Sequence, residues 1–365
     1  MQPTFPQPSA PAPAPSSCPQ CGTELAPKLL VCPACHRLVH AEELKRLAAE
    51  AEHSEQAHDL TSALSKWREA QELLPPDSRQ YQSISERIAA LSEKVDTGSP
   101  SPSGKSQPSP REAAAAKKTR LGKAWAWTVA TVSLFLTKFK LLLLGLTKLG
   151  TVWSMLLAFG VYWAIWGWKF AAGLVVSIYI HEMGHVYALS RFGMKATAPM
   201  FIPGFGALIR MKQHPASPRE DARVGLAGPL WGLAAALAAL AIYQLTGAHI
   251  WAAIARVGAW INLFNLIPIP PLDGGRGFRS LSRSQRWIVA AAMALMWAVT
   301  KEGLIVLLVI VAAWRAFSEK TKIEPDQKGL IQYAFLVVAL SAMCLVPVPD
   351  ISPHRASPQQ QESSP

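Results

Sequence analysis

The feature that most limits what this chain can fold into is a succession of apolar stretches beyond residue 149. Most are near the ~20 residues that a helix needs to cross a bilayer. The expected spans are 150–168, 170–192, 224–246, 250–267, 287–300 with 304–317 as a short hairpin, and 330–348. They exclude a single soluble globular domain. We therefore predict a mainly α fold, in which a polytopic α-helical membrane bundle of about six to seven spans occupies residues 124–349.

The distribution of charge supports a membrane protein rather than a nucleic-acid-binding one. The formal net charge is +12, yet only 16% of the residues are charged, against roughly 25% in an average soluble protein. The basic excess lies in the tryptophan-rich apolar part of the chain, which favours the lipid bilayer as partner and gives no reason to expect nucleic acid. Lys and Arg gather in the connections 191–223, 276–286 and 315–328, so by the positive-inside rule these connections are expected in the cytoplasm.

The segment 124–149 is apolar but is interrupted by Lys138, Lys140 and Lys148. Each lysine at the bilayer centre would cost about 2.5–3.5 kcal/mol, so we expect an interfacial or partly inserted helix rather than a plain span. The Ser/Pro/Gly-rich, basic segment 97–123 before it is typical of a flexible linker. The tail at 350–365 is expected to be disordered.

The N-terminal part contains a pattern typical of a zinc ribbon over residues 18–40. The proline-rich leader 1–17 has neither the basic start nor the apolar core of a signal peptide, and we expect it to be disordered. Two Cys-x-x-Cys turns follow, Cys18 with Cys21 and Cys32 with Cys35, and they can present four thiolates to one tetrahedral ion. Two disulfides are the alternative, disfavoured because cytosolic thiols are kept reduced. The pattern predicts a structural zinc that supplies the fold.

Residues 41–96 show apolar positions at the spacing of three and four that is typical of helices. Pro75 and Pro76 end the middle helix, and Asp77 or Ser78 can cap the next one. The run from Ala63 onward resembles a single tetratricopeptide-type hairpin. One such unit cannot bury its own face, so it serves either as a spacer against the zinc ribbon or as a docking site for a protein partner.

One predicted span contains the pattern His181-Glu182-Met183-Gly184-His185. Residues i and i+4 share a helix face, so both imidazoles can reach a single zinc ion, and Glu182 is placed as a candidate general base. Glu182 also lies inside an apolar run, where an ionisable residue marks a functional site by default. Two histidines and a glutamate that only link helices by hydrogen bonds are the alternative.

A catalytic zinc needs a third protein ligand, and the end of a later span offers Asp273. Pro268, Pro270 and Pro271 remove backbone donors there, and the glycines after Asp273 permit a tight turn. The carboxylate can thus be carried back towards the bundle interior, where broken helix is tolerated against protein or a water-filled cavity. Taken alone, Asp273 would equally serve as a helix cap at the membrane boundary.

Together these motifs resemble the site-2 protease family of intramembrane zinc metalloproteases. The resemblance rests on His181 to His185 in one span, Ala227-Gly228-Pro229 in the next, and Asn265 to Gly274 at the end of a third. It implies His181, His185 and Asp273 as ligands of a catalytic zinc, Glu182 as general base and then acid, and Asn265 as a substrate-positioning residue. It also implies a multi-pass protease that cleaves transmembrane protein substrates in regulated intramembrane proteolysis. By the positive-inside rule, the zinc ribbon and the active-site side are expected to face the cytoplasm.

Two further expectations follow from the chain. Residues 196–211 are too short and too rich in Gly and Pro for a span, and they favour a β-hairpin or a membrane-entering loop. In the family such an element could pair with an unwound substrate, although a purely structural loop fits equally well. The alternative to a protease is a non-proteolytic zinc-binding membrane scaffold or sensor, in which the zinc ribbon and helical hairpin carry the function.

Overall fold

The structure is a computed structural model that describes residues 17–27, 29–97, 149–197, 199–202, 206–208, 211, 213–318 and 323–348. The predicted leader, the linker, the interfacial helix and the tail lie almost entirely outside the described residues. The chain divides into two compact units. The first combines Met1–Thr119 with Leu189–Lys195 and Met211–Glu220, and the second combines Arg120–Ala188, Ala196–Arg210 and Asp221–Pro365.

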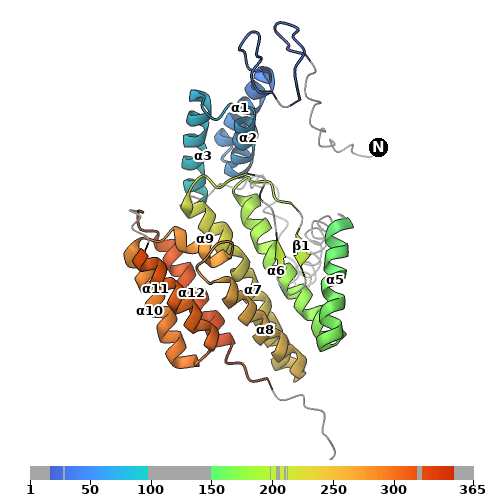
Figure 1. Ribbon diagram of the computed structural model, residues 1–365, viewed down its shortest axis with the longest axis vertical. Coiled ribbons are helices and arrows are strands. Elements are labelled where there is room, and N and C mark those ends of the chain that lie inside the picture. Colours follow the sequence, from blue (N-terminus) through green and yellow to red (C-terminus); the bar gives the residue numbers. More distant parts are fainter. Residues whose placement is uncertain are drawn as a thin grey trace, which may run out of the picture. The chain divides into compact units, whose positions relative to one another are not determined.

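The first unit begins with the cysteine-bearing segment and continues into three helices, α1 (Ala41–Gln56), α2 (Leu60–Glu72) and α3 (Arg79–Thr97). Helix α2 packs between the other two (Figure 1). It ends before Pro75, and the Ser78 hydroxyl accepts a hydrogen bond from the Tyr81 backbone N–H at 3.1 Å as α3 begins. The predicted helix break and cap are therefore both present. Leu64, Trp67 and Ile88 are buried between the helices.

A buried ion pair ties α2 to the two other segments of this unit. The Arg68 side chain is 3% exposed and donates to the Phe192 carbonyl at 3.1 Å, to the His214 carbonyl at 3.2 Å and to the Glu220 carboxylate. The second carboxylate oxygen of Glu220 accepts from the Ala216 backbone N–H at 2.7 Å. Arg68 therefore donates hydrogen bonds to three residues that lie more than 120 positions later in the sequence.

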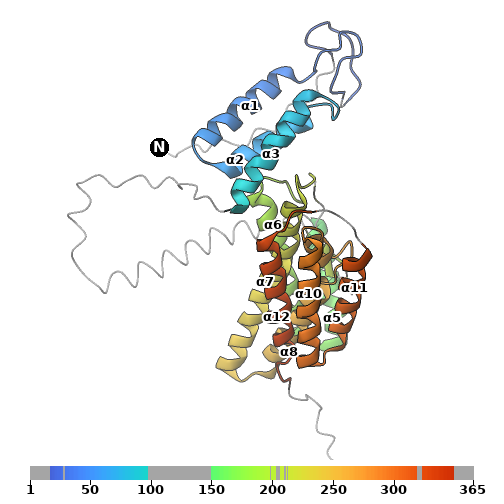
Figure 2. The ribbon, with the colours of Figure 1, turned by 90° about the vertical axis from the view of Figure 1, so that its left-hand side faces the viewer.

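The second unit is a helical bundle. Its helices are α5 (Leu149–Trp166), the longer part of α6 (Trp168–Arg191), most of α7 (Pro218–Thr246), α8 (His249–Asn265), α9 (Asp273–Arg279), α10 (Arg283–Thr300), α11 (Gly303–Ser318) and α12 (Gln327–Met343). Helices α10, α11 and α12 run side by side (Figure 1, Figure 2). The main apolar core lies among α7 to α12, and a smaller one lies among α5, α6 and the strand that follows. The mainly α prediction is confirmed.

A β-hairpin is present within the predicted segment 196–211. Strands β1 (Met200–Ile202) and β2 (Gly206–Leu208) pair antiparallel, with Phe201 opposite Ala207. Phe201 is buried against α5, and its backbone N–H donates to the Ser154 hydroxyl at 3.1 Å. The first of the two expectations for this segment, a hairpin, is the one that the structure shows.

Large apolar side chains point outward over much of the bundle. Trp153 is 65% exposed and Trp314 is 64% exposed, and the outer faces of α10 and α12 carry further exposed leucine, isoleucine and phenylalanine side chains. Among the described helices, α7 is the one both long and apolar enough to cross a membrane, while α5, α11 and α12 are apolar but shorter. The prediction of six to seven spans is therefore not confirmed by helix length alone.

Candidate metal and catalytic site

Helix α6 places the imidazoles of His181 and His185 on one face, as the spacing predicts. Their Nε2 atoms lie 3.2 Å apart, and both side chains are buried. Helix α7 crosses α6 at this level, and a Cβ atom on Gly228 would lie 2.2 Å from the His185 Nε2 atom and 2.7 Å from that of His181. Only glycine lets the backbone of α7 come this close to both rings.

Asp273 is the first residue of α9 and follows a proline-rich segment. Helix α8 ends at Asn265, and the proline-rich segment that follows leaves backbone carbonyls without helical partners. Two side chains of the C-terminal helices satisfy them, because Tyr333 donates to the Leu266 carbonyl at 2.5 Å and Arg315 donates to the Pro268 carbonyl at 2.8 Å. The segment that leads to Asp273 is thereby held by hydrogen bonds at the Leu266 and Pro268 carbonyls.

Helix α7 also holds α9 through charge. Asp221 accepts from Arg276 at 2.8 Å and from Arg279 at 2.7 Å, so one carboxylate bridges two arginines of the short helix. The short helix that begins at Asp273 is thus tied to α7 through two of its side chains. The position of the third candidate ligand depends on this packing as well as on its own turn.

The three predicted ligands converge on one point. The Asp273 Oδ2 atom lies 3.1 Å from His181 Nε2 and 3.2 Å from His185 Nε2. Both Nδ1 atoms are used elsewhere, since His185 Nδ1 lies 2.8 Å from the Val224 carbonyl and His181 Nδ1 lies 2.7 Å from the Asn262 Oδ1 atom. A carbonyl oxygen only accepts, so His185 donates through Nδ1, and the neutral imidazole then has its lone pair on Nε2.

This donor set fits a zinc ion. Two imidazole nitrogens and one carboxylate oxygen are the ligand types that catalytic zinc sites use, and the fourth position remains for water or substrate. Each histidine has an outer hydrogen bond that fixes its ring, as is usual for metal-ligating histidines. The residues present therefore fit the metal that the sequence predicts.

The remaining two predicted site residues take different positions. Glu182 is 5% exposed and follows His181 directly in α6. Asn265 is half-buried at the end of α8, and its role in positioning substrate stays a prediction. The asparagine in contact with His181 is instead Asn262, which the sequence analysis did not single out. The sequence feature that could have identified Asn262 is a second asparagine about one helical turn before Asn265 in an apolar helix.

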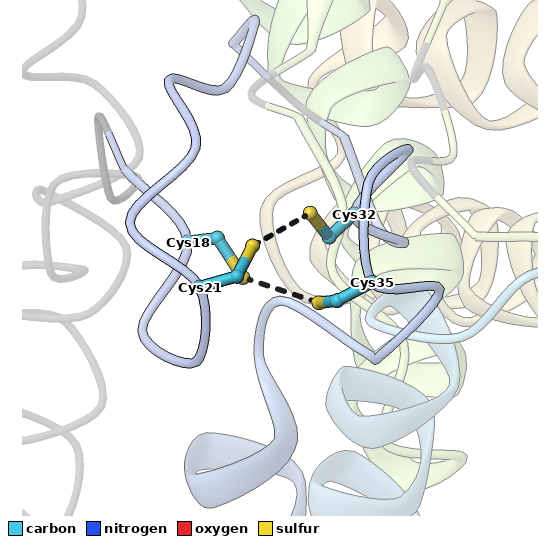
Figure 3. A group of neighbouring side chains, drawn as sticks. All are labelled: Cys18, Cys21, Cys32 and Cys35. Carbon is cyan, nitrogen blue, oxygen red and sulfur yellow. Dashed lines mark hydrogen bonds between the residues drawn. The ribbon is translucent and has the colours of Figure 1, made fainter.

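The four N-terminal cysteines form a second cluster, in the first unit. Figure 3 shows the sulfurs of the two turns facing one another. Cys18 and Cys35 Sγ lie 3.7 Å apart, and Cys21 and Cys32 Sγ lie 3.6 Å apart, too far for disulfides and suited to one shared ion. This arrangement confirms a zinc-ribbon-like cysteine cluster, as the sequence predicts, and the structure does not show the alternative of two disulfides.

Ionisation of the cluster is uneven. The Thr23 hydroxyl, 3.2 Å from Cys21 Sγ, lowers the pKa of that thiol to about 6. The Arg37 backbone lowers the pKa of Cys35, but burial and the three neighbouring sulfurs outweigh it and raise the pKa to about 11. The thiolate is the form that binds metal, so Cys21 is closer to that form at neutral pH than Cys35.

Comparison with known proteins agrees with the geometry. A sequence profile of Peptidase family M50 matches residues 169–249. Zinc metalloprotease MJ0392 of Methanocaldococcus jannaschii is 30% identical over 113 residues, which cover 30% of this chain and 32% of that protein. Rip3 of Mycobacterium tuberculosis, designated a zinc metalloprotease, is 32% identical over 167 residues, which cover 42% of this chain and 41% of that protein.

Stage IV sporulation protein FB of Bacillus subtilis is 33% identical over 106 residues, which cover 28% of this chain and 36% of that protein. The chain thus spans 32% to 41% of the length of these relatives. The matched residues include both histidines and Gly228 but end before Asp273. Residues 169–249 match the profile of Peptidase family M50, and the resemblance to the site-2 protease family that the motifs predict is confirmed.

Proposed function

We propose that this chain is an intramembrane zinc metalloprotease that hydrolyses peptide bonds in or near transmembrane segments of membrane-protein substrates. The observation that carries the proposal is the convergence of the His181, His185 and Asp273 ligand atoms within 3.2 Å of one another. They converge inside a bundle whose outer faces expose large apolar side chains. Exposed apolar surface of this extent is typical of contact with lipid.

In this proposal His181, His185 and Asp273 hold the catalytic zinc. Zinc bound there would supply Lewis-acid polarisation of the scissile carbonyl and would lower the pKa of water to about 7. Glu182 accepts the proton that water loses as its oxygen bonds to the carbonyl carbon. Glu182 then returns that proton to the amine nitrogen as the C–N bond breaks, so one water is consumed for each peptide bond.

The substrate must expose its backbone before it can be cut. A transmembrane helix keeps its carbonyls in i to i−4 hydrogen bonds, so cleavage is expected at residues that weaken a helix. We propose that Asn265 positions the unwound segment, as the resemblance implies. Hairpin β1–β2 offers strand backbone with which an extended substrate segment could pair. The burial of Phe201 against α5 fits a purely structural role for the hairpin equally well.

We also propose that the second unit is multi-pass. Helix α5 has 18 residues and α10 has 18, which at 1.5 Å per residue is about 27 Å and close to the ~30 Å hydrocarbon core. The basic connections and the N-terminal zinc ribbon would then face the cytoplasm, as the positive-inside rule predicts. The cysteine cluster would hold a second, structural zinc, and the helices of the first unit would offer a surface to a protein partner.

The test compares wild type with Glu182→Gln in cells that express the full chain. Mass spectrometry of protein N-termini in the membrane fraction would identify new ends that lie inside predicted spans. Wild type should generate such ends and Glu182→Gln should not, at equal expression and equal zinc content. The matched control is Glu86→Gln, which makes the same change at an exposed position of α3 and should leave the cleavage pattern unaltered.

Two results would count against the proposal. Identical new N-termini from wild type and Glu182→Gln would remove Glu182 from the chemistry. If neither protein generated ends inside spans while both bound zinc, the non-proteolytic scaffold would be the better description.

A further inference from the structure

Asn262 is a polar side chain in the apolar interior of the second unit. It lies in α8, three residues before the motif asparagine, and is 2% exposed. Its neighbours on the buried face of the helix are Gly258, Ala259 and Leu263. A buried amide in such surroundings is destabilising unless it is hydrogen-bonded, so its contacts show what it does.

Asn262 makes two hydrogen bonds, and the first fixes the direction of the second. Its Nδ2 atom donates to the Gly258 carbonyl at 2.7 Å, which leaves Oδ1 to face the Nδ1 atom of His181, also at 2.7 Å. Since Oδ1 only accepts, His181 must carry its proton on Nδ1. In the neutral imidazole the lone pair of His181 is then on Nε2, the atom that faces Asp273 and His185.

The neighbouring helix α7 comes very close to the Asn262 amide at Gly232. A Cβ atom on Gly232 of α7 would lie 1.9 Å from the Oδ1 atom and 2.4 Å from the Cγ and Nδ2 atoms of Asn262. The amide therefore sits directly against the backbone of α7, with glycine as the residue that makes the space. Any larger residue at position 232 would push the end of the Asn262 side chain away from His181.

We propose that Asn262 is a positioning residue of the metal site, acting on His181, and that Gly232 provides the space in which it acts. The inference rests on the proposed function, because it assumes that His181 Nε2 binds zinc. Asn262 sets the tautomer and the ring orientation of His181, as the Val224 carbonyl does for His185. It contacts no other candidate ligand among the described residues.

A purely structural hydrogen bond between α6 and α8 would give the same contacts, so the test needs a readout that stability alone does not move. Partners in the second coordination layer change metal affinity by about 10–100-fold when they are removed. The readout is therefore zinc affinity of the purified full chain in detergent, measured by competition with a chromophoric chelator. His181→Ala provides the baseline in which the cysteine cluster remains as the other candidate zinc site.

Four variants separate the explanations. Asn262→Leu keeps the approximate shape and removes the acceptor, and Gly232→Ala displaces the amide without changing it; both should weaken the site by about 10–100-fold. Asn262→Asp retains an oxygen acceptor towards His181 and should recover most of the affinity. Gly160→Ala is the matched control, because a Cβ atom there meets nothing within 4 Å and affinity should equal that of wild type.

The outcomes are distinguishable. Zinc affinity of Asn262→Leu and Gly232→Ala equal to that of Gly160→Ala would overturn the inference and leave the proposed function intact. Equal losses in Asn262→Asp and Asn262→Leu would also overturn it, since packing and not the acceptor would then control the site. Wild type that binds no more zinc than His181→Ala would contradict the proposed function itself. If Asn262→Leu fails to fold, Gly232→Ala decides.

Discussion

Replacing Arg68 with leucine should loosen α2 from the two segments it contacts within the first unit. Arg68 is almost completely buried, and its guanidinium serves the Glu220 carboxylate and the carbonyls of Phe192 and His214. Burial lowers the pKa of Arg68 while the Glu220 charge opposes that change. Glu220 would retain its hydrogen bond from the Ala216 N–H but would lose the guanidinium of Arg68.

The magnitude follows from the burial of both partners. Removing one partner of a buried ion pair costs about 3–5 kcal/mol, because the other charge stays buried without compensation. At about 1.4 kcal/mol for each factor of ten, hydrogen-exchange protection of the α2 amides should fall by roughly two to three and a half powers of ten. The double variant Arg68→Leu, Glu220→Leu should lose less than Arg68→Leu alone, since no lone charge is left inside.

The assay is hydrogen exchange with mass spectrometry on the full chain in detergent, read on peptides from α2. Arg46→Leu is the matched control: its pairs with Glu43 and Glu50 lie on the exposed face of α1, and α2 protection should be unchanged. A loss below tenfold in Arg68→Leu, or a double variant less protected than the single variant, would refute the reasoning that loss of the buried Arg68–Glu220 pair dominates the effect.

Three further perturbations have defined outcomes. Cys32→Ser should remove one zinc equivalent and make residues 17–40 sensitive to limited proteolysis, because so short a segment needs metal to fold; unchanged zinc content would contradict this. Tyr333→Phe leaves the buried Leu266 carbonyl without its donor and should cost about 1–3 kcal/mol in thermal unfolding; an unchanged melting temperature would argue against that bond. Burial alone would raise the pKa of Asp326, but Arg223 holds it below its usual range. Because the folded-state pKa of Asp326 is depressed, the pair with Arg223 stabilises the protein above about pH 4, and this contribution is lost as the pH falls below that value. In Asp326→Asn the free energy of unfolding should therefore depend less on pH below about pH 4 than in wild type.

The local parts of the site were predictable from sequence because helix geometry is local. A spacing of four places His181 and His185 on one face of any α-helix, and the structure has them there. Pro75 and Pro76 likewise predict a helix end whatever the tertiary structure is. The same reasoning indicated that the chain turns near Asp273, because three prolines precede it and two glycines follow.

Asn262 shows what such reasoning misses. Two asparagines lie near the end of α8, and the motif drew attention to Asn265. Which of them faces His181 is decided by the rotation of α8 against α6 and by the space left at Gly232. Those are properties of helix packing, which no short pattern contains.

Arg68 was missed for a related reason. In an amphipathic helix an arginine beside Trp67 is ordinarily read as a solvent-exposed residue. Its partner Glu220 is 152 residues away in sequence, so no pattern within α2 could reveal the pair. The number of spans is a third example, because apolar runs predict where helices lie more reliably than how completely each crosses a membrane.

The central claim, that Glu182 beside a zinc held by His181, His185 and Asp273 hydrolyses peptide bonds within the membrane, has one most direct test. A single-span protein that co-purifies with Glu182→Gln would be placed in liposomes with zinc-loaded wild type or zinc-loaded Glu182→Gln, and its cleavage followed by mass spectrometry. We predict one cut inside the span with wild type and none with Glu182→Gln at the same zinc content. Cleavage at the same bond and rate by both proteins would contradict the claim.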